Sequence, residues 1–157
     1  MKYIPVGNGK EAIVDDDFPE SLFTMKWRTR ARNYVCIEMR FKNEINVVFL
    51  HYAVLDRKDG FFIDHINGNP LDNQRANLRY ATHAQNMRNR KLNKNNTSGY
   101  KGVLAPRGKD KTWRAEIKCN NIRYRLGSFK NKEDAARAYN IAAIRYHGEF
   151  ARLNIIS

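Results

Sequence analysis

Residues 61–90 read FFIDHINGNPLDNQRANLRYATHAQNMRNR, and the rest of the chain is arranged around this stretch. Its apolar start, 61–63, predicts a buried β-strand, and the Asn-Gly pair at 67–68 supplies the positive φ angles that a tight turn needs. Asp64 and His65 therefore stand at the end of a strand, where both side chains are held on a rigid base.

The second part of the stretch predicts another strand and then a helix. Residues 78–81 fit a short strand, and Thr82 can cap a helix that runs to about Arg90. His83 and Asn86 share one side of that helix, because residues three or four apart lie on the same helix face. Asn86 can therefore face the preceding pair of strands.

These residue types suit the hydrolysis of a phosphodiester bond. The reaction needs a nucleophile, neutralisation of charge on the phosphate and help for the departing 3′ oxygen, and one divalent cation supplies the last two. A hard ion such as Mg²⁺, with Mn²⁺ as the alternative, takes oxygen ligands and keeps several waters, so the Asp64 carboxylate and the Asn86 amide suffice. His65, with an ordinary pKa of about 6.5, can accept a proton from water at neutral pH.

The set formed by Asp64, His65, Asn77 and Asn86 resembles the active-site unit of phage-type HNH homing endonucleases, in the variant whose final histidine position is asparagine. The resemblance implies a ββα-metal unit in which Asp64 and Asn86 bind the metal and His65 is the general base. Asn77, twelve residues after His65, is the middle asparagine and is expected to hydrogen-bond across the loop. Many members end with a histidine ligand, so His83 is the alternative to Asn86.

The formal net charge of +13 implies an anionic partner. The charge is uneven: residues 1–90 hold 14 basic and 11 acidic residues, a net +3, whereas 91–157 hold 15 and 5, a net +10. Basic residues interleaved with aromatic ones favour double-stranded DNA as the partner. A membrane surface is discounted, because no stretch approaches the roughly 20 apolar residues of a spanning helix.

The cysteines and the N-terminus predict a cytoplasmic protein, in a bacterium or a phage-infected host. MKYIPVGNGK lacks the apolar core of a signal peptide, and Cys36 and Cys119 fall in different halves of the chain. Reduced thiols are therefore expected, and the ligand spacing of a zinc site is absent from the sequence. We expect a monomer.

Residues 1–55 predict a small α+β region ahead of the HNH segment. The expected elements are strands at 2–5 and 11–14, a helical turn at 19–25, and a hairpin of 34–40 with 44–50. Alternating apolar residues of the hairpin are expected to face the core: Val35, Ile37 and Met39 on one strand, and Ile45, Val47 and Phe49 on the other. His51 matches a histidine common just ahead of the HNH unit in related nucleases, and a packing role is expected for it.

After a polar, asparagine-rich linker at 91–98, residues 99–157 show a new pattern. Apolar and charged residues alternate along 113–119 and 122–126, so one sheet face is apolar and the other is charged. Asn120-Asn121 fits a two-residue hairpin turn. This turn places three pairs of residues opposite each other: Cys119 and Ile122, Lys118 and Arg123, Glu116 and Arg125. A helix is predicted over 132–147, capped by Asn131 and ended by Gly148.

The motifs YKGV, WRAEI, LGSF, EDAARAYN and ARLN, in this order, resemble the AP2 DNA-binding domain over nearly all of residues 97–156. The resemblance implies a three-stranded antiparallel sheet on one helix, with the sheet in the major groove of DNA. The positions that match DNA-contacting residues, together with Arg114 on the same face, are Lys101, Arg114, Glu116, Lys118, Arg123 and Arg125. Leu104 and Arg125 depart from the usual arginine and tryptophan, so no base preference follows. Trp113 is expected in the core.

Together these patterns predict an α+β chain with an N-terminal region at 1–90, whose HNH core is 61–90, a linker at 91–98 and an AP2-like domain at 99–157. The predicted function is that of a metal-dependent, site-directed DNA endonuclease of the homing type. One alternative is a DNA-binding regulator with an inactive HNH unit, which the complete HNH set disfavours. The other is a nonspecific nuclease, which a separate reader domain disfavours.

Overall fold

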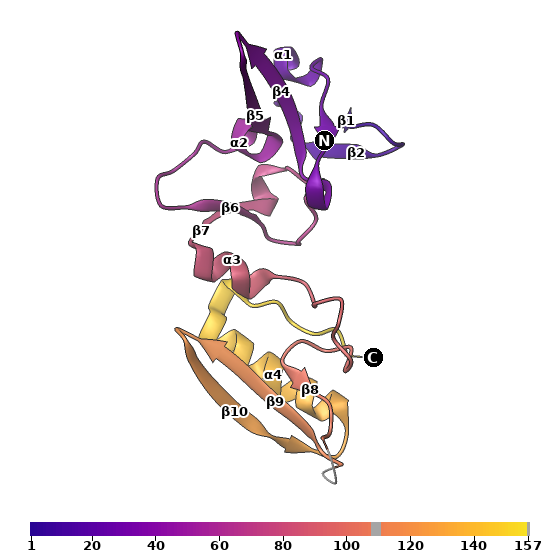
Figure 1. Ribbon diagram of the computed structural model, residues 1–157, viewed down its shortest axis with the longest axis vertical. Helices are drawn as coiled ribbons and strands as arrows, with labels where there is room; N and C mark the ends of the chain where they lie inside the picture. The colour runs from indigo at the N-terminus through magenta and orange to yellow at the C-terminus, as the bar shows by residue number, and fades with distance from the viewer. Residues whose placement is uncertain (108–110, 157) are drawn as a thin grey trace. The chain divides into compact units, whose positions relative to one another are not determined.

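The computed structural model describes residues 1–107 and 111–156 (Figure 1). The chain forms two compact units, Met1–His83 (unit 1) and Ala84–Ser157 (unit 2). Both are built from small antiparallel sheets and short helices, which confirms the α+β class. Among the described residues, no helix is long and apolar enough to cross a membrane.

Unit 1 begins with short strands and helices around one apolar core. In chain order these are β1 (Lys2–Pro5), β2 (Glu11–Val14), α1 (Glu20–Phe23), β3 (Arg28–Thr29), η1 (Ala31–Asn33), β4 (Val35–Phe41), β5 (Glu44–Phe49) and α2 (Leu50–Val54). The positions of β1, β2, α1, β4 and β5 match the predicted elements, whereas β3, η1 and α2 were not predicted. Ile4, Val14, Phe18, Trp27 and Leu50 belong to the core, and the indole Nε1 of Trp27 donates to the Leu22 carbonyl at 2.8 Å.

The β4–β5 hairpin departs from the prediction. A two-residue turn pairs Phe41 with Glu44, so Ile37 lies opposite Val48 and not opposite Val47. The two predicted apolar sets therefore lie on opposite faces of the sheet. The prediction that Met39 and Ile45 face the core is wrong, because these side chains lie near the turn of the hairpin and are 45% and 55% exposed.

The HNH stretch folds into β6 (Phe62–His65), η2 (Arg75–Asn77), β7 (Leu78–Ala81) and α3 (His83–Asn89), close to the predicted bounds. β6 and β7 pair antiparallel, and Gly68 in the connecting loop has a φ of 69°. Ile63 is buried, but Phe61 and Phe62 are 38% and 46% exposed. The predicted burial of the whole apolar run is therefore wrong, because Phe61 precedes the strand and Phe62 lies on the face opposite to Ile63.

Unit 2 holds a three-stranded antiparallel sheet in the order β10-β9-β8 and one long helix, as predicted (Figure 1). Its elements are β8 (Val103–Leu104), β9 (Trp113–Cys119), β10 (Ile122–Phe129), α4 (Lys132–His147) and η3 (Gly148–Phe150). Asn120 and Asn121 form the turn, with φ angles of 49° and 64°. The three predicted pairs, Cys119 with Ile122, Lys118 with Arg123 and Glu116 with Arg125, are all present.

Helix α4 lies on the apolar side of this sheet. Its N-terminus is capped by Asn131, whose Oδ1 accepts a hydrogen bond from the Asp134 backbone N–H at 2.8 Å, and Gly148 follows its last turn with a φ of 56°. Small buried residues of α4 pack near Ala115 and Ile117 of β9, and Trp113 packs against the same core, as predicted. The end of the predicted linker is also part of this unit, because Ser98 is buried and its Oγ donates to the Val103 carbonyl at 2.9 Å.

Replacing Gly102 with alanine should destabilise unit 2. A Cβ at this position would lie 2.0 Å from the Tyr139 ring and 2.7 Å from the Glu116 carbonyl, at a φ of 72°. We expect a loss of about 3 kcal/mol or more in the free energy of unfolding, measured by urea denaturation. Gly99→Ala is the matched control, because Gly99 has a similar φ of 79° with nothing within 4 Å, and it should cost about 1 kcal/mol. Equal losses in the two variants would contradict the steric account.

Candidate active site

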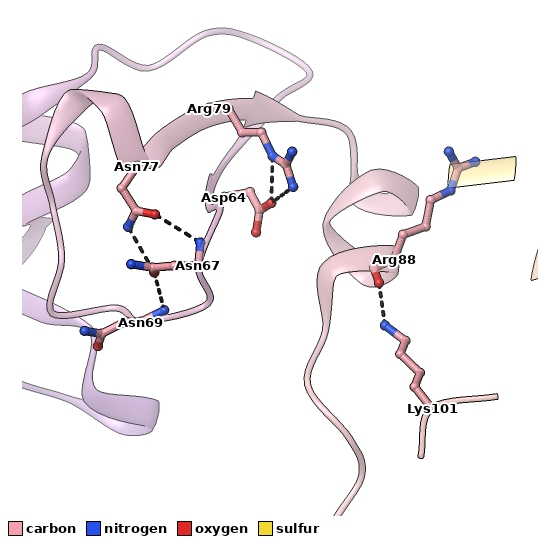
Figure 2. A network of polar contacts seen from close by, with 7 residues as sticks. All are labelled: Asp64, Asn67, Asn69, Asn77, Arg79, Arg88 and Lys101. Atoms are coloured by element: carbon pink, nitrogen blue, oxygen red, sulfur yellow. Dashed lines mark hydrogen bonds and ion pairs between the residues drawn. The ribbon is translucent and has the colours of Figure 1, made fainter. Parts of the chain in front are cut away.

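Asp64 and His65 lie at the end of β6 and are both buried, with 6% and 4% of their surface exposed. The loop that follows is closed by Asn77. Its Oδ1 accepts from the backbone N–H of Asn67 at 3.0 Å, and its Nδ2 donates to the Asn67 Oδ1 at 3.1 Å (Figure 2). The same Nδ2 also donates to the Asp72 carbonyl at 2.8 Å. The backbone carbonyl of Asn77 also accepts from Ile66 at 2.8 Å. Asn77 thus ties the first residues after the strand to the last residues of the loop.

The same loop is attached to strand β2. Ile13 donates its N–H to the Leu71 carbonyl and accepts from the Asn73 N–H, both at 2.8 Å. Farther along, Arg75 donates its backbone N–H to Asp15 at 2.8 Å, and its guanidinium pairs with Asp17 at 2.6 Å. These long-range contacts were not predicted, because nothing in the local sequence pairs the loop with a particular strand.

The carboxylate of Asp64 forms an ion pair with Arg79 on the neighbouring strand. Nε and Nη2 of Arg79 lie 3.1 and 2.9 Å from the same oxygen, Oδ2 (Figure 2). Both side chains are largely buried, with 7% and 12% exposed. Asp64 and Arg79 are direct cross-strand neighbours. The sequence did not predict this pair, because it did not predict the register between β6 and β7.

Asp64 and Asn86 are each of a residue type that can bind a hard divalent cation. Asp64 provides a carboxylate and α3 carries the amide of Asn86, both of them oxygen ligands suited to Mg²⁺. Across the described ranges, no cluster of three or more His, Cys, Asp and Glu residues could hold a metal. A cation bound through Asp64 would therefore complete its coordination with amide, water or phosphate oxygens. His83, the alternative ligand, lies with its ring edge-on to Phe62 at 6.0 Å between centroids.

An aromatic cluster surrounds His65. Its ring lies 5.5 Å from that of His51 and 6.0 Å from that of Tyr34, and His51 stacks on Phe49 at 5.5 Å. Burial, followed by the charge of His65, lowers the pKa of His51 to about 4. Burial also lowers the pKa of His65, against the opposing effects of its Asn73 hydrogen bond and of Asp64. His51 is therefore a buried, neutral residue that packs within this cluster.

The charged face of the unit 2 sheet carries most of the predicted DNA-binding residues. Lys118, Arg123 and Arg125 are exposed, and the Arg123 guanidinium lies 3.7 Å from the Glu116 carboxylate. Arg114 is half-buried, and among the described residues its buried Nη2 has no hydrogen-bond acceptor.

Lys101 differs from the other predicted DNA-binding residues. Its Nζ donates to the backbone carbonyl of Arg88 (Figure 2). It also donates to the backbone carbonyl of Arg90 at 2.7 Å. Burial, and then Arg152 and Arg90, lower the pKa of Lys101 to about 8. Arg88 adds a second contact, from Nη2 to the Asn120 Oδ1 at 3.0 Å. Lys101 and Arg88 thus fix the C-terminal end of α3 within unit 2. The alternation of residues along the strands could not predict these contacts.

Comparisons with known proteins agree with both halves of this description. The HNH endonuclease family model matches residues 56–88. An uncharacterized HNH endonuclease of Acanthamoeba polyphaga mimivirus is 33% identical over 110 residues, 69% of this chain and 56% of its own length. Protein 3.8 of Escherichia phage T7 is 37% identical over 93 residues, 59% of this chain and 75% of its own length. An AP2/ERF and B3 domain-containing protein of Oryza sativa subsp. japonica is 46% identical over 59 residues, 37% of this chain and 15% of its own length.

The chain therefore belongs to the HNH endonuclease family, and it carries an AP2-like region as well. No solved structure gave a significant match. The chain spans little more than half the length of the mimivirus relative.

Acid should destabilise the protein through His51. In the unfolded chain its imidazole titrates near 6.5 and in the folded protein near 4, so between these pH values the unfolded chain binds a proton that the folded protein excludes. The free energy of unfolding should therefore fall as the pH drops from 7 to 4, by at most roughly 3 kcal/mol from this residue. Urea denaturation at a series of pH values measures the slope. His51→Phe keeps an aromatic ring and should flatten the slope, and an equally steep loss in that variant would contradict the assignment.

Proposed function

We propose that the protein is a metal-dependent endonuclease that hydrolyses phosphodiester bonds of double-stranded DNA, at sites selected by the sheet of unit 2. The observation that carries the proposal is the buried Asp64-His65 pair at the end of a strand. Asn77 closes the loop that follows this pair, and both lie within the stretch that matches the HNH family. The names of the viral relative and of the AP2/ERF relative support the two parts of this function.

In this mechanism His65 accepts a proton from the attacking water. Its low pKa, caused by burial, keeps the ring neutral at physiological pH, which a general base requires. Asp64 and Asn86 would hold the cation, which when bound neutralises charge on the scissile phosphate and on the leaving oxygen. Asn77 fixes the loop that follows His65, and Arg79 orients the Asp64 carboxylate.

The charged sheet face would contact DNA through Arg114, Lys118, Arg123 and Arg125, with Glu116 among them. Lys118 lies directly opposite Arg123, and like charges in that position destabilise a sheet unless an anion covers them. The buried Nη2 of Arg114 is a donor that a phosphate oxygen would satisfy. We propose a homing-type enzyme over an inactive DNA-binding relic, because the chain retains a complete candidate HNH residue set, Asp64, His65, Asn77 and Asn86.

His65→Ala should abolish cleavage and leave DNA affinity within about twofold, because a base that acts on water contributes little to ground-state binding. Cleavage of the source genome with mapping of the ends, and binding by gel shift, measure the two effects. A fully active variant would remove His65 from the mechanism.

The choice of metal ligand on α3 can be tested with Asn86→Ala and His83→Ala. The first should weaken the binding of Mg²⁺ and lower the cleavage rate, because it removes an oxygen ligand. The second should have a mild effect. A dead His83→Ala beside an active Asn86→Ala would reverse the assignment.

Lys101 and Lys118 should have separable effects. Lys118→Met should lower the slope of log affinity against log salt by about 0.9, the value for one lost phosphate contact. Lys101→Met should leave this slope unchanged but slow cleavage, because Lys101 anchors α3, which carries Asn86. Salt titrations and single-turnover rates on the full chain measure both. A slope lowered equally in the two variants would place Lys101 on the DNA instead.

A further inference from the structure

Asn73 is a fully buried amide, with 0% of its surface exposed, that contacts the predicted base. Its Oδ1 lies 3.2 Å from Nε2 of His65. The metal-binding and DNA-binding roles described above make no use of this side chain. A buried amide is retained at a cost in desolvation, so its hydrogen bonds indicate what it does.

The orientation of the Asn73 amide is fixed by its other contacts. Nδ2 donates to the Pro70 carbonyl at 3.2 Å, and a carbonyl oxygen can only accept, so the amide nitrogen must face Pro70 and Oδ1 must face His65. The backbone N–H of Asn73 donates to the Ile13 carbonyl at 2.8 Å, which attaches the residue to strand β2. Because Oδ1 carries no proton, the hydrogen atom of this contact must sit on Nε2 of His65.

We propose that Asn73 is a positioning residue that holds His65 in the tautomer protonated at Nε2, so that Nδ1 is the atom that accepts the proton from water. The second part rests on the proposed nuclease function. In that step the water proton moves to Nδ1, the electron pair of the water oxygen forms the bond to phosphorus, and the 3′ oxygen leaves with the electron pair of the broken P–O bond. The Nε2 proton stays on its bond to Asn73 throughout.

Asparagine suits this position better than aspartate. A carboxylate at residue 73 would place a second buried negative charge near Asp64. Asp64 already forms an ion pair with Arg79, so the second charge would have no partner of its own in that pair. A neutral acceptor selects the tautomer without that charge. The attachment of Asn73 to Ile13 also assigns a role to the β1–β2 hairpin, which fixes the acceptor that orients His65.

Nitrogen-15 NMR of the full-length protein tests the tautomer directly, without DNA or metal. Two-bond proton–nitrogen correlations of ¹⁵N-histidine-labelled protein near pH 8 separate the two neutral tautomers, and His65→Gln identifies the His65 signals by their loss. The expected result is Nε2–H for the wild type. A signal showing Nδ1–H as the main form would overturn the proposal, whether or not the protein cleaves DNA.

Kinetics test the consequence for cleavage. Asn73→Leu removes the acceptor and should lower kcat by about 10²-fold, with KM within about twofold, because the ring no longer favours one tautomer. Asn73→Asp, which keeps an oxygen at the same place, should restore the Nε2–H pattern and recover part of kcat. An unchanged kcat in folded Asn73→Leu, checked by the NMR spectrum, would overturn the role of Asn73. A fully active His65→Ala would instead overturn the nuclease role of His65 and leave the tautomer assignment standing.

Discussion

Two buried polar side chains at the end of β6 impose the main constraint on unit 1. A buried carboxylate or imidazole is costly unless hydrogen bonds or an opposite charge satisfy it, so Asp64 and His65 require partners. Arg79 on the next strand pairs with Asp64, and Asn73 in the connecting loop contacts His65. The loop must therefore return past both residues before β7 begins, and its asparagine contacts and its attachment to β2 hold it in that path.

The aromatic residues beside His65 complete this environment. His51, Tyr34 and Phe49 come from the end of one hairpin and the start of α2, and they remove water from one side of the ring. Desolvation disfavours the charged form of an imidazole, which explains why the pKa of His65 is lowered although a carboxylate precedes it. The N-terminal region thus contributes residues to the surroundings of the candidate site.

The sequence predicted most reliably those features that short-range chemistry determines. The Asn120-Asn121 turn fixes the β9–β10 register because a two-residue loop leaves one pairing, and Asn131 and Gly148 define α4 by capping. The Asp64–Arg79 pair could not be predicted in this way, because a long loop joins their strands and leaves the register open. The β4–β5 faces were misassigned for a related reason, since alternation within each strand does not say which residues lie opposite.

Helix α3 carries a residue proposed for the nuclease, yet most of the helix belongs to unit 2. It has seven residues, too few for a helix to be stable by itself in water, so its conformation depends on packing. The boundary between the compact units falls after His83, and the contacts of Lys101 and Arg88 hold the end of α3 within the AP2-like unit. Asn86, the proposed ligand of the nuclease, is thus carried by a segment whose order depends on the AP2-like unit. Competence to cleave is therefore expected to depend on the integrity of unit 2 as well as on its affinity for DNA.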